Sequence, residues 1–291
     1  LDEDGGATLE THDSAGYFDM APVDQAEECR REMVQVLEAL DFEVEAAHHE
    51  VAPGQHEIDF KYGDALATAD NLCTFKFVVR KVAQDYGLHA TFMPKPIYGI
   101  NGSGMHTHQS LFQGGENAFF DPEGEYRGIS KTGLHYIGGL TTHAQAFCAL
   151  TNPIVNSYKR LVPGYEAPTE ICWSERNRSP LARVPDRRGV ATRVELRSPD
   201  PSCNPYLAFA GMLAAGLDGV AKEIDPGPPV NANLYAMSAE ERAERGIKSL
   251  PGNLKDAIAA FEGSDLMRAA LGDHIFTHFV AAKRTEWQDY I

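Results

Sequence analysis

The chain has 291 residues, of which 43% are hydrophobic, and it carries a formal net charge of −16. So acidic a surface repels nucleic acid and anionic membranes, and we expect neither as a partner. No apolar run reaches the ~20 residues of a membrane-spanning helix, and the acidic first residues are unlike a signal peptide, which predicts a cytoplasmic protein. The cysteines lack the close spacing of zinc or redox motifs, which predicts free, buried thiols at Cys29, Cys73, Cys148, Cys172 and Cys203.

Two helices are predicted in the first part of the chain. The first runs from about Asp24 to Leu40, where Asp24 and Glu27 have the spacing of a capping pair ahead of an apolar stripe. The second is long and ends at Gly87, a residue suited to a left-handed C-terminal cap. Residues 88–93 then have the composition of a strand.

A hairpin is predicted between these two helices. Strands near residues 42–49 and 57–60 flank a turn at 52–55 that contains Pro and Gly. Glu50 and Glu57 therefore flank the same turn.

The second part of the chain begins with a polar strand. Alternation over residues 106–112 places His106, His108 and Ser110 on one face. A helix is predicted to begin at Ser130 and to end near Asn152, which precedes a proline.

The remaining pattern indicates the fold class. Residues 163–168 predict an exposed, mobile loop, residues 190–197 alternate as a strand, and the chain is mostly helical from Asn204 onward. Strands interleaved with helices and hairpin-like connections predict an α+β fold, with a largely antiparallel curved sheet backed by helices. No linker-like segment divides the chain, so we expect residues 1–291 to form one domain.

Three charged residues, Arg193, Glu195 and Arg197, share one face of the strand predicted at 190–197. Taken alone, this pattern also fits a solvated strand face with surface ion pairs. A charged face buried in the protein needs charged partners, however, and guanidinium groups bind phosphates and carboxylates through paired hydrogen bonds. Further arginines precede the strand in an otherwise acidic chain: Arg160, Arg178, Arg183, Arg187 and Arg188.

Carboxylates and imidazoles supply candidate metal ligands. Divalent cations such as Mg²⁺ and Mn²⁺ prefer oxygen ligands and accept an occasional histidine. Each glutamate taken singly is more typical of a solvated surface charge. The pair His106 and His108 fits one shared metal or two separate roles, so a zinc hydrolase stays an alternative. The candidate ligands are Glu50, Glu57, His106 and Glu195.

A set of motifs along nearly the whole chain resembles those of type I glutamine synthetases. The motifs are His48-His49-Glu50-Val51, Gly54-Gln55-His56-Glu57, Met93-Pro94-Lys95-Pro96, Asn101-Gly102-Ser103-Gly104-Met105-His106-Thr107-His108, Asn152-Pro153, Tyr158-Lys159-Arg160-Leu161, Pro163-Gly164-Tyr165-Glu166-Ala167-Pro168, Asn177-Arg178-Ser179 and Arg193-Val194-Glu195-Leu196-Arg197. The resemblance implies ATP-dependent ligation of ammonia to the γ-carboxyl of L-glutamate. The reaction proceeds through γ-glutamyl phosphate and gives L-glutamine, ADP and phosphate.

The resemblance also implies residue roles. Two or more Mg²⁺ or Mn²⁺ ions are expected per site, one bound by Glu50 and Glu57 and a second by His106 and Glu195. Glu166 is expected to close over the acyl phosphate and to take a proton from ammonium. The expected glutamate contacts are Asn101, Gly102, Arg160, Glu166 and Arg197. The expected ATP contacts are Glu45, His108, Ser110, Arg183, Arg193 and Arg178, of which Arg178 also holds the transferred phosphoryl group.

Family members carry an N-terminal β-grasp domain and a strand with two more metal-binding glutamates ahead of the matched residues. The resemblance therefore implies an N-terminally truncated catalytic domain, and for the full-length family a dodecamer of two stacked hexameric rings. Two rival functions stay open: a γ-glutamyl ligase that uses an organic amine, and an inactive ring-forming fragment. The flap motif around Glu166 and the sequence Asn177-Arg178-Ser179 favour ammonia as the substrate.

Overall fold

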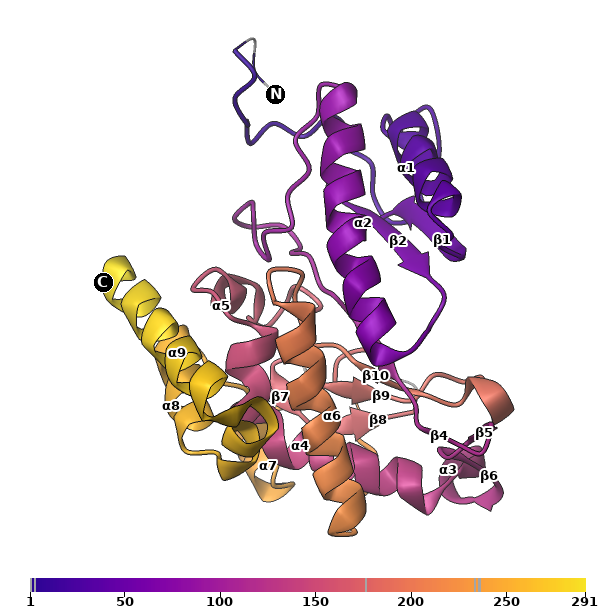
Figure 1. Cartoon of the computed structure of the whole chain (residues 1–291), viewed down its shortest axis with the longest axis vertical. Coiled ribbons are helices and arrows are strands. Elements are labelled where there is room, and N and C mark those ends of the chain that lie inside the picture. Colours follow the sequence, from indigo (N-terminus) through magenta and orange to yellow (C-terminus); the bar gives the residue numbers. More distant parts are fainter. Residues whose placement is uncertain (1, 3, 176, 233, 235–236) are drawn as a thin grey trace. The chain divides into compact units, whose positions relative to one another are not determined.

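The computed structural model describes residues 2, 4–175, 177–232, 234 and 237–291, and the chain forms two compact units, residues 1–103 and 104–291 (Figure 1). Strands that are mostly antiparallel alternate with helices, which confirms the α+β class. Within the described residues, no helix is both long enough and apolar enough to cross a membrane. The two units are described in turn.

In the first unit, two helices pack with a β-hairpin. Helices α1 (Glu27–Ala39) and α2 (Ala65–Asp85) contact each other, and strands β1 (Val44–His49) and β2 (His56–Phe60) pair antiparallel. This arrangement confirms the predicted hairpin and long helix, and Gly87 adopts a left-handed φ of +69° just beyond α2. The helices and the hairpin share a buried apolar cluster: Cys29, Met33, Leu37, Phe42, Val78, Val82 and Ala83.

The predicted capping pair of the first helix is wrong. Helix α1 begins after Ala26 without a side-chain cap. Asp24 instead accepts a hydrogen bond from the Ala26 N–H and forms a 2.7 Å ion pair with Arg30. The arginine competes for the carboxylate because a charged donor binds it more strongly than a backbone amide does.

The strand predicted at residues 88–93 does not form. This segment has no strand partner, and Phe92 instead packs against Phe75 and the guanidinium of Arg80, which lies 5.1 Å from the ring centre. The apolar side chain of Phe92 therefore packs against α2, although the segment does not form a strand. The five cysteines are free as predicted, but Cys73 on α2 is exposed, so the prediction of a buried thiol is wrong there.

The second unit contains a four-stranded sheet in the order β3, β10, β9, β8. Neighbouring strands run antiparallel except for the parallel pair β8 and β9. Val194, Leu196, Ala182 and Trp173 belong to the buried apolar core of this unit. The strand bounds are β3 (Thr107–Gln109), β8 (Trp173–Ser174), β9 (Ala182–Arg183) and β10 (Val194–Leu196).

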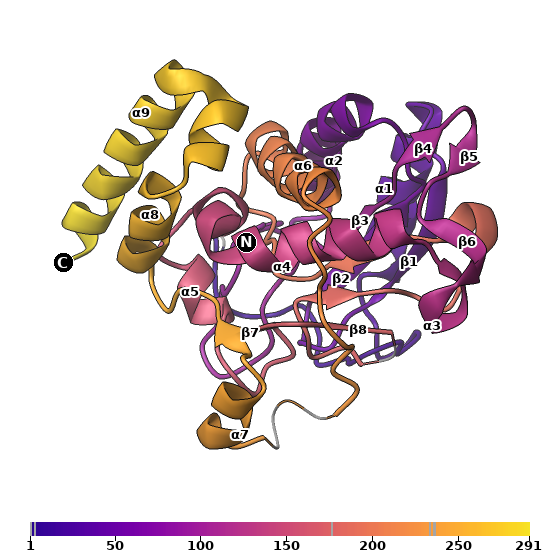
Figure 2. The same ribbon diagram turned by 90° about the horizontal axis from the view of Figure 1, so that it is seen from below.

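Long helices complete this core. Helix α4 (Lys131–Thr151) lies against α6 (Pro205–Ala221) in both Figure 1 and Figure 2, and α8 (Leu254–Glu262) packs on α4 and α9 (Asp265–Tyr290). Ser130 caps α4 as predicted by accepting a hydrogen bond from the Gly133 N–H. The shorter elements are β4 (Phe112–Gln113), β5 (Glu116–Asn117), β6 (Phe120–Gly124), α3 (Glu125–Gly128), α5 (Ser157–Arg160), β7 (Glu170–Ile171), η1 (Gly189–Ala191), α7 (Ala239–Glu244) and β11 (Lys248–Ser249).

Two predicted strands of this unit are shorter than expected. The strand at 106–112 is interrupted after Gln109, so Ser110 lies outside β3. The strand at 190–197 is regular only over β10, because a 3₁₀ turn precedes it. There the Asn117 side chain donates to the carbonyls of Val190 and Thr192, which replaces the hydrogen bonds of a strand ladder.

Glycines allow α4 and α6 to approach backbone to backbone. A Cβ built on Gly139 would lie 2.1 Å from the Ala215 carbonyl oxygen, and one built on Gly219 would lie 2.2 Å from the His135 carbonyl oxygen. Neither neighbour is a flexible side chain that could move aside. The crossing of these helices therefore depends on the missing side chains.

Gly219→Ala should destabilise the second unit by about 3 kcal/mol, since overpacking a tight contact forces backbone shifts. An exposed helix glycine would instead gain up to ~1 kcal/mol from the same change. Chemical denaturation followed by tryptophan fluorescence measures the effect, because Trp173 lies in this core. Thr142→Ala, an exposed position on α4, is the control and should stay within about 0.5 kcal/mol of the parent. A stabilised Gly219→Ala variant would contradict the packing argument.

Candidate active site

One face of the β1–β2 hairpin gathers acidic residues and an imidazole. His48 lies directly opposite Glu57 in the antiparallel register. Asp59 lies two residues further along β2, and Glu50 lies two residues after His48, just beyond the end of β1. Cross-strand partners and residues two apart share a face, so these four side chains point the same way. Ligand atoms of His48, Glu50 and Glu57 all lie within 4.8 Å of one another.

Desolvation and crowding of like charges govern the acid–base properties of this face. The Glu57 side chain is 41% exposed. Desolvation, followed by the negative charges of Asp59 and Glu50, nevertheless raises its pKa to about 7. Desolvation likewise raises the pKa of Asp59. A group of carboxylates that resist joint ionisation is a favourable environment for a divalent cation.

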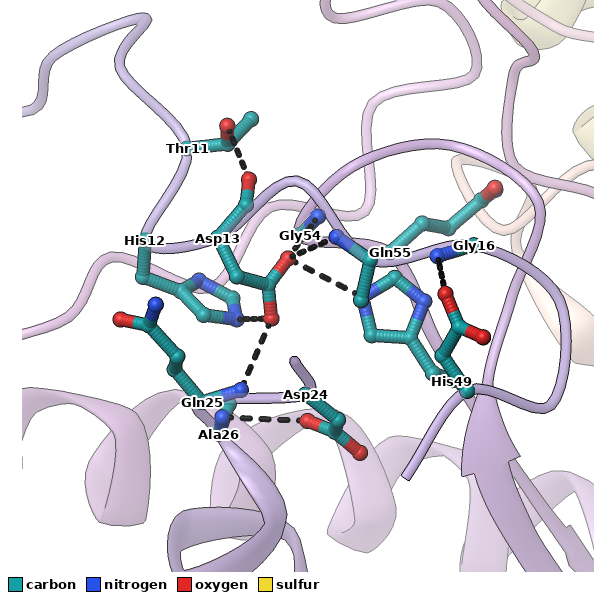
Figure 3. Close-up of polar contacts among 12 residues, drawn as sticks. Thr11, His12, Asp13, Gly16, Asp24, Gln25, Ala26, His49, Gly54 and Gln55 are labelled. Atoms are coloured by element: carbon teal, nitrogen blue, oxygen red, sulfur yellow. Dashed lines mark hydrogen bonds and ion pairs between the residues drawn. The ribbon is translucent and has the colours of Figure 1, made fainter. Parts of the chain in front are cut away.

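The opposite face of the hairpin is fixed by Asp13 (Figure 3). The Asp13 carboxylate accepts hydrogen bonds from the backbone N–H of Gly54 at 3.0 Å and of Gln25 at 3.1 Å. It also pairs with His49 Nε2 at 3.1 Å, and both of these side chains have no exposed surface. Burial alone would raise the pKa of Asp13, but these hydrogen bonds hold it below its ordinary value. Asp13 thus joins the turn at 52–55 to the start of α1.

The His49 ring extends this connection to Glu50. Its Nδ1 lies 2.7 Å from the Glu50 carbonyl oxygen and its Nε2 faces Asp13, so both nitrogens face groups that only accept hydrogen bonds. The buried ring therefore links the Asp13 carboxylate to the backbone that bears Glu50.

The predicted glutamate-binding loop of the first unit is tied to the same turn. Gln55 donates from Nε2 to the Gly102 carbonyl at 2.9 Å, and Ala52 N–H donates to Gln55 Oε1 at 3.1 Å. Asn101 and Gly102 are half-buried next to this bond. Glu45, predicted to contact ATP, is exposed on β1.

In the second unit, Glu195 lies at the centre of a charged sheet face. On β10 it is opposite His108 of β3 and Arg183 of β9, and cross-strand partners share a face. Arg193 and Arg197 flank β10, each two residues from Glu195, and His106 lies two residues before His108. The structure therefore brings together six residues predicted from the sequence: His106, His108, Arg183, Arg193, Glu195 and Arg197.

Glu195 is buried among positive groups. Its side chain is 4% exposed, forms an ion pair with Arg183, and lies 3.4 Å from both Arg197 Nε and His106 Nδ1. Burial alone would raise the pKa of Glu195, but His106 and Arg183 hold it below its ordinary value. Desolvation, with the positive charge of Arg197, lowers the pKa of His106 to about 3. A neutral imidazole beside an ionised carboxylate is a competent pair of metal ligands.

Arg160 is positioned next to this face by backbone carbonyls. It is 3% exposed and donates to the carbonyls of Ser198 at 2.7 Å and Arg197 at 3.1 Å. Desolvation lowers its pKa to about 10, so the guanidinium stays charged at neutral pH. A Cβ on Gly104 would lie 2.7 Å from Arg160 Nη2 and 3.0 Å from His106 Nε2, so this glycine leaves room for both. Such a buried cation suits a carboxylate ligand.

The loop at residues 163–168 carries Glu166 on the outside. Glu166 is exposed and adopts a φ of +63°, an unusual conformation for a residue with a side chain. Ala167 and Pro168 are buried and anchor the end of the loop. Arg178 is exposed in a separate turn, which the Asn177 side chain closes by accepting from the Ser179 N–H at 3.0 Å.

Comparisons with known proteins identify the family of this chain. The family model for the glutamine synthetase catalytic domain matches residues 3–291. The chain belongs to the glutamine synthetase family. Glutamine synthetase from Thermus thermophilus is 62% identical over 99% of this chain, and that from Halobacterium salinarum is 57% identical over 99%. A solved GmaS–ADP complex superposes with a TM-score of 0.89 at 38% identity, covering 100% of this chain and 67% of that one.

The chain spans only part of the curated glutamine synthetases that it matches, 64% of the length of the Thermus thermophilus and Halobacterium salinarum proteins. The fold and family membership are those of the catalytic domain. Two features of this family member were not singled out from its sequence as site residues, namely His48 beside the predicted metal-binding glutamates and Asp13 behind them. The period-2 pattern of the hairpin could have indicated His48, since it lies two residues before Glu50.

Asp13→Asn should weaken the hairpin of this glutamine synthetase domain by about 1–3 kcal/mol, because the amide would replace one oxygen that accepts the buried hydrogen bonds of the carboxylate. Native-state hydrogen exchange over residues 44–60 measures the opening free energy of β1 and β2. Asp19→Asn is the matched control: Asp19 also accepts a backbone hydrogen bond, from Gly16 at 2.9 Å, but it is exposed. Equal exchange in the two variants would contradict a stabilising role for the buried contacts of Asp13.

Proposed function

We propose that this chain carries the reaction centre for ATP-dependent ligation of ammonia to the γ-carboxyl of L-glutamate. The observation that carries the proposal is the sheet face around Glu195. There, one buried carboxylate is surrounded by guanidinium and imidazole groups that exceed it in number. Such an excess suits a site for phosphates and carboxylates. Identity of 62% to a glutamine synthetase supports the same reaction.

The cation sites of the proposal lie on two sheet faces. Glu50 and Glu57 would hold one Mg²⁺ or Mn²⁺ ion on the hairpin, and His106 with Glu195 would hold another. The donor sets fit divalent cations. Glu50 and Glu57 offer carboxylate oxygens close to each other, and His106 with Glu195 combines an imidazole nitrogen with a carboxylate. A bound divalent cation would supply positive charge to the nucleotide phosphates during phosphoryl transfer.

The arginines would bind the two anionic substrates. Arg160 and Arg197 would hold the carboxylates of glutamate, and the loop at Asn101 and Gly102 would contact the same substrate through its backbone. The terminal phosphoryl group of ATP would pass to the γ-carboxylate oxygen and release ADP, with Arg178 holding the transferred group. The remaining ATP contacts in this proposal are Glu45, His108, Ser110, Arg183 and Arg193.

Glu166 would complete the second step. Its exposed position in the loop at 163–168 leaves the carboxylate available to an incoming ammonium ion. Glu166 would take a proton from ammonium, and the resulting ammonia would attack the acyl carbon. Phosphate would leave with the bonding electron pair and take the second proton that the nitrogen loses as the amide forms. Exclusion of water by the same loop would protect the acyl phosphate.

Phosphate release from ATP tests the reaction. We expect release by the purified chain to require both glutamate and ammonia, because the acyl phosphate forms only on glutamate and is consumed by ammonia. Methylamine in place of ammonia tests the rival amine-dependent ligase. Release without glutamate, or a preference for methylamine, would refute the proposal. The expected dodecamer stays a prediction that sedimentation of the same sample checks.

Glu166→Ala should lower ammonia-dependent turnover by ~10²-fold or more while leaving nucleotide affinity nearly unchanged, since a positioned base typically contributes that much. Glu223→Ala is the control, because Glu223 is also an exposed glutamate with a left-handed backbone, at φ +51°. The Glu223→Ala variant reproduces the effect of placing alanine at a left-handed backbone position, but Glu223 has no proposed role in the reaction. Equal turnover in Glu166→Ala and the parent would remove Glu166 from the reaction.

Gly104→Ala should raise the KM for glutamate roughly 10–100-fold, because an added methyl group would displace the Arg160 guanidinium. Initial rates of phosphate release at varied glutamate measure the change. Gly252→Ala serves as the control, since a Cβ there would meet nothing within 4 Å. An unchanged KM would mean that Arg160 does not contact glutamate.

A further inference from the structure

Two buried polar side chains near Arg160 have no role in the proposed function. Asn152 ends helix α4, Asp200 follows strand β10, and each is 0% exposed. We propose that Asn152 and Asp200 are positioning residues for the glutamate substrate, which fix the carbonyl to which Arg160 donates and balance its buried positive charge. This inference rests on the proposed function, which assigns a carboxylate of glutamate to Arg160.

The Ser198 carbonyl oxygen joins Asn152 to Arg160. It accepts a hydrogen bond from Arg160 Nη1 at 2.7 Å and another from Asn152 Nδ2 at 2.8 Å. A carbonyl oxygen has two lone pairs, so these two donors fill it. A change in the Asn152 amide would therefore move the acceptor that orients one arm of the guanidinium group.

Hydrogen bonds on both sides of its amide hold Asn152 in one orientation. Its Oδ1 accepts from Thr151 Oγ1 at 2.9 Å, and its Nδ2 also donates to Asp200 Oδ2 at 3.0 Å. Carbonyl and carboxylate oxygens only accept, so Nδ2 must face them. The Asp200 N–H donates to the Thr151 carbonyl at 3.1 Å. The end of α4 is thus fastened to the segment that follows β10 by side-chain and backbone bonds.

Asp200 places a negative charge in the interior of the second unit. Its Oδ1 accepts hydrogen bonds from the Ser202 N–H at 3.0 Å and from Ser202 Oγ at 2.5 Å, while Oδ2 accepts from Asn152. These donors are neutral, so they solvate the carboxylate without cancelling its charge. A buried carboxylate of this kind needs a cation nearby.

Arg160 is the cation on which that charge acts. Burial lowers the pKa of Arg160 to about 10, and the positive charge of Arg197 also lowers it. The negative charge of Asp200 opposes both effects and raises the pKa. Asp200 and Arg160 are therefore opposite buried charges that stabilise each other.

The pairing is indirect, which matters for substrate binding. Within the described part of the chain, the hydrogen bonds of Arg160 go to the carbonyls of Ser198 and Arg197. A bidentate ion pair with Asp200 would use paired N–H groups that a substrate carboxylate needs. A countercharge connected through Asn152 and a carbonyl instead keeps the cation buried and leaves its other N–H groups for glutamate.

The neighbouring arginines are balanced differently. Arg183 and Arg197 both form ion pairs with Glu195. In the proposed function Glu195 also binds a divalent cation, so its charge is shared among several partners. Asp200 has no such partner in the proposal, which makes its charge specific to Arg160.

Calorimetric titration of the full chain with L-glutamate, with ADP and Mg²⁺ present, tests the positioning role. Asp200→Asn removes the charge and one acceptor at nearly constant shape, and it should weaken glutamate binding by roughly 10–100-fold, the scale of a displaced binding group. Asn152→Ser should weaken it by about tenfold, because the Ser198 carbonyl loses one of its donors. ADP affinity, titrated separately with Mg²⁺, should stay within about twofold in both variants.

Initial rates give a second readout that a merely structural role would not produce. The KM for glutamate should rise by the same factor as the dissociation constant in each variant. The kcat should stay within about threefold, because Arg160 holds the substrate in the ground state and the transition state alike. A general loss of structure would instead lower kcat and nucleotide affinity together.

Asn117→Ser is the matched control for Asn152→Ser. Asn117 is a buried amide of the same unit that also makes two Nδ2 hydrogen bonds, to the carbonyls of Val190 at 2.9 Å and Thr192 at 2.7 Å. Its loss should shift the urea midpoint of unfolding by a similar amount, but glutamate affinity should stay within about twofold.

A milder variant keeps the test decisive if Asp200→Asn does not fold. Ser202→Ala removes one hydrogen bond to Asp200 from a half-buried side chain and leaves the charge in place. It should weaken glutamate binding by about two- to fivefold, in proportion to one lost bond. Near-ultraviolet circular dichroism establishes that each variant is folded.

The outcomes separate this inference from the proposed function. Glutamate affinity that is unchanged in the folded variants, while the parent chain binds glutamate, would overturn the positioning role and leave the function standing. Equal weakening of glutamate and ADP binding would overturn it as well. Absence of glutamate binding by the parent chain would overturn both. Weaker glutamate binding with normal ADP affinity and kcat, absent in Asn117→Ser, would support the inference.

Discussion

Mutual repulsion of carboxylates on one face of a hairpin is the constraint on which the first unit depends. Glu50, Glu57 and Asp59 share that face, and desolvation together with this crowding raises the pKa of Glu57 to about 7. A free hairpin would relieve the repulsion by twisting or fraying. Here the buried pair of Asp13 and His49 holds the turn from the opposite face, so the acidic groups stay together. The buried contact on one face of the hairpin therefore keeps the carboxylates of the other face close to one another.

The second unit has the opposite arrangement of charge. A single buried carboxylate, Glu195, lies among Arg183, Arg197 and two imidazoles, so positive groups are in excess. In a chain with a net charge of −16, such a local excess is unusual, and it attracts anions where the surface as a whole repels them. One unit therefore gathers negative groups on a hairpin face, while the other gathers guanidinium groups around a buried carboxylate.

Structural features that depend on residues close together in the sequence were predictable from the sequence. The hairpin that carries Glu50 and Glu57, the Ser130 cap and the charged face of β10 all follow from spacings of two to four residues. The failures have distant or competing causes. Arg30 removes Asp24 from its predicted cap, and Asn117 captures the carbonyls that precede β10. Asp13 had no local signal, because its partners lie 36 and 41 residues away.

Alternation along the hairpin limits how this part of the chain can change its length. Neighbouring side chains point to opposite faces of the hairpin. His48 and Glu50 lie on the face with the carboxylates, while His49 lies on the face where it contacts Asp13. Deleting or inserting one residue in either strand would exchange these two sets of side chains, placing an acidic carboxylate in the interior and a structural imidazole in solvent. Strand length is therefore fixed, and gaps here should be absent among functional descendants of this chain.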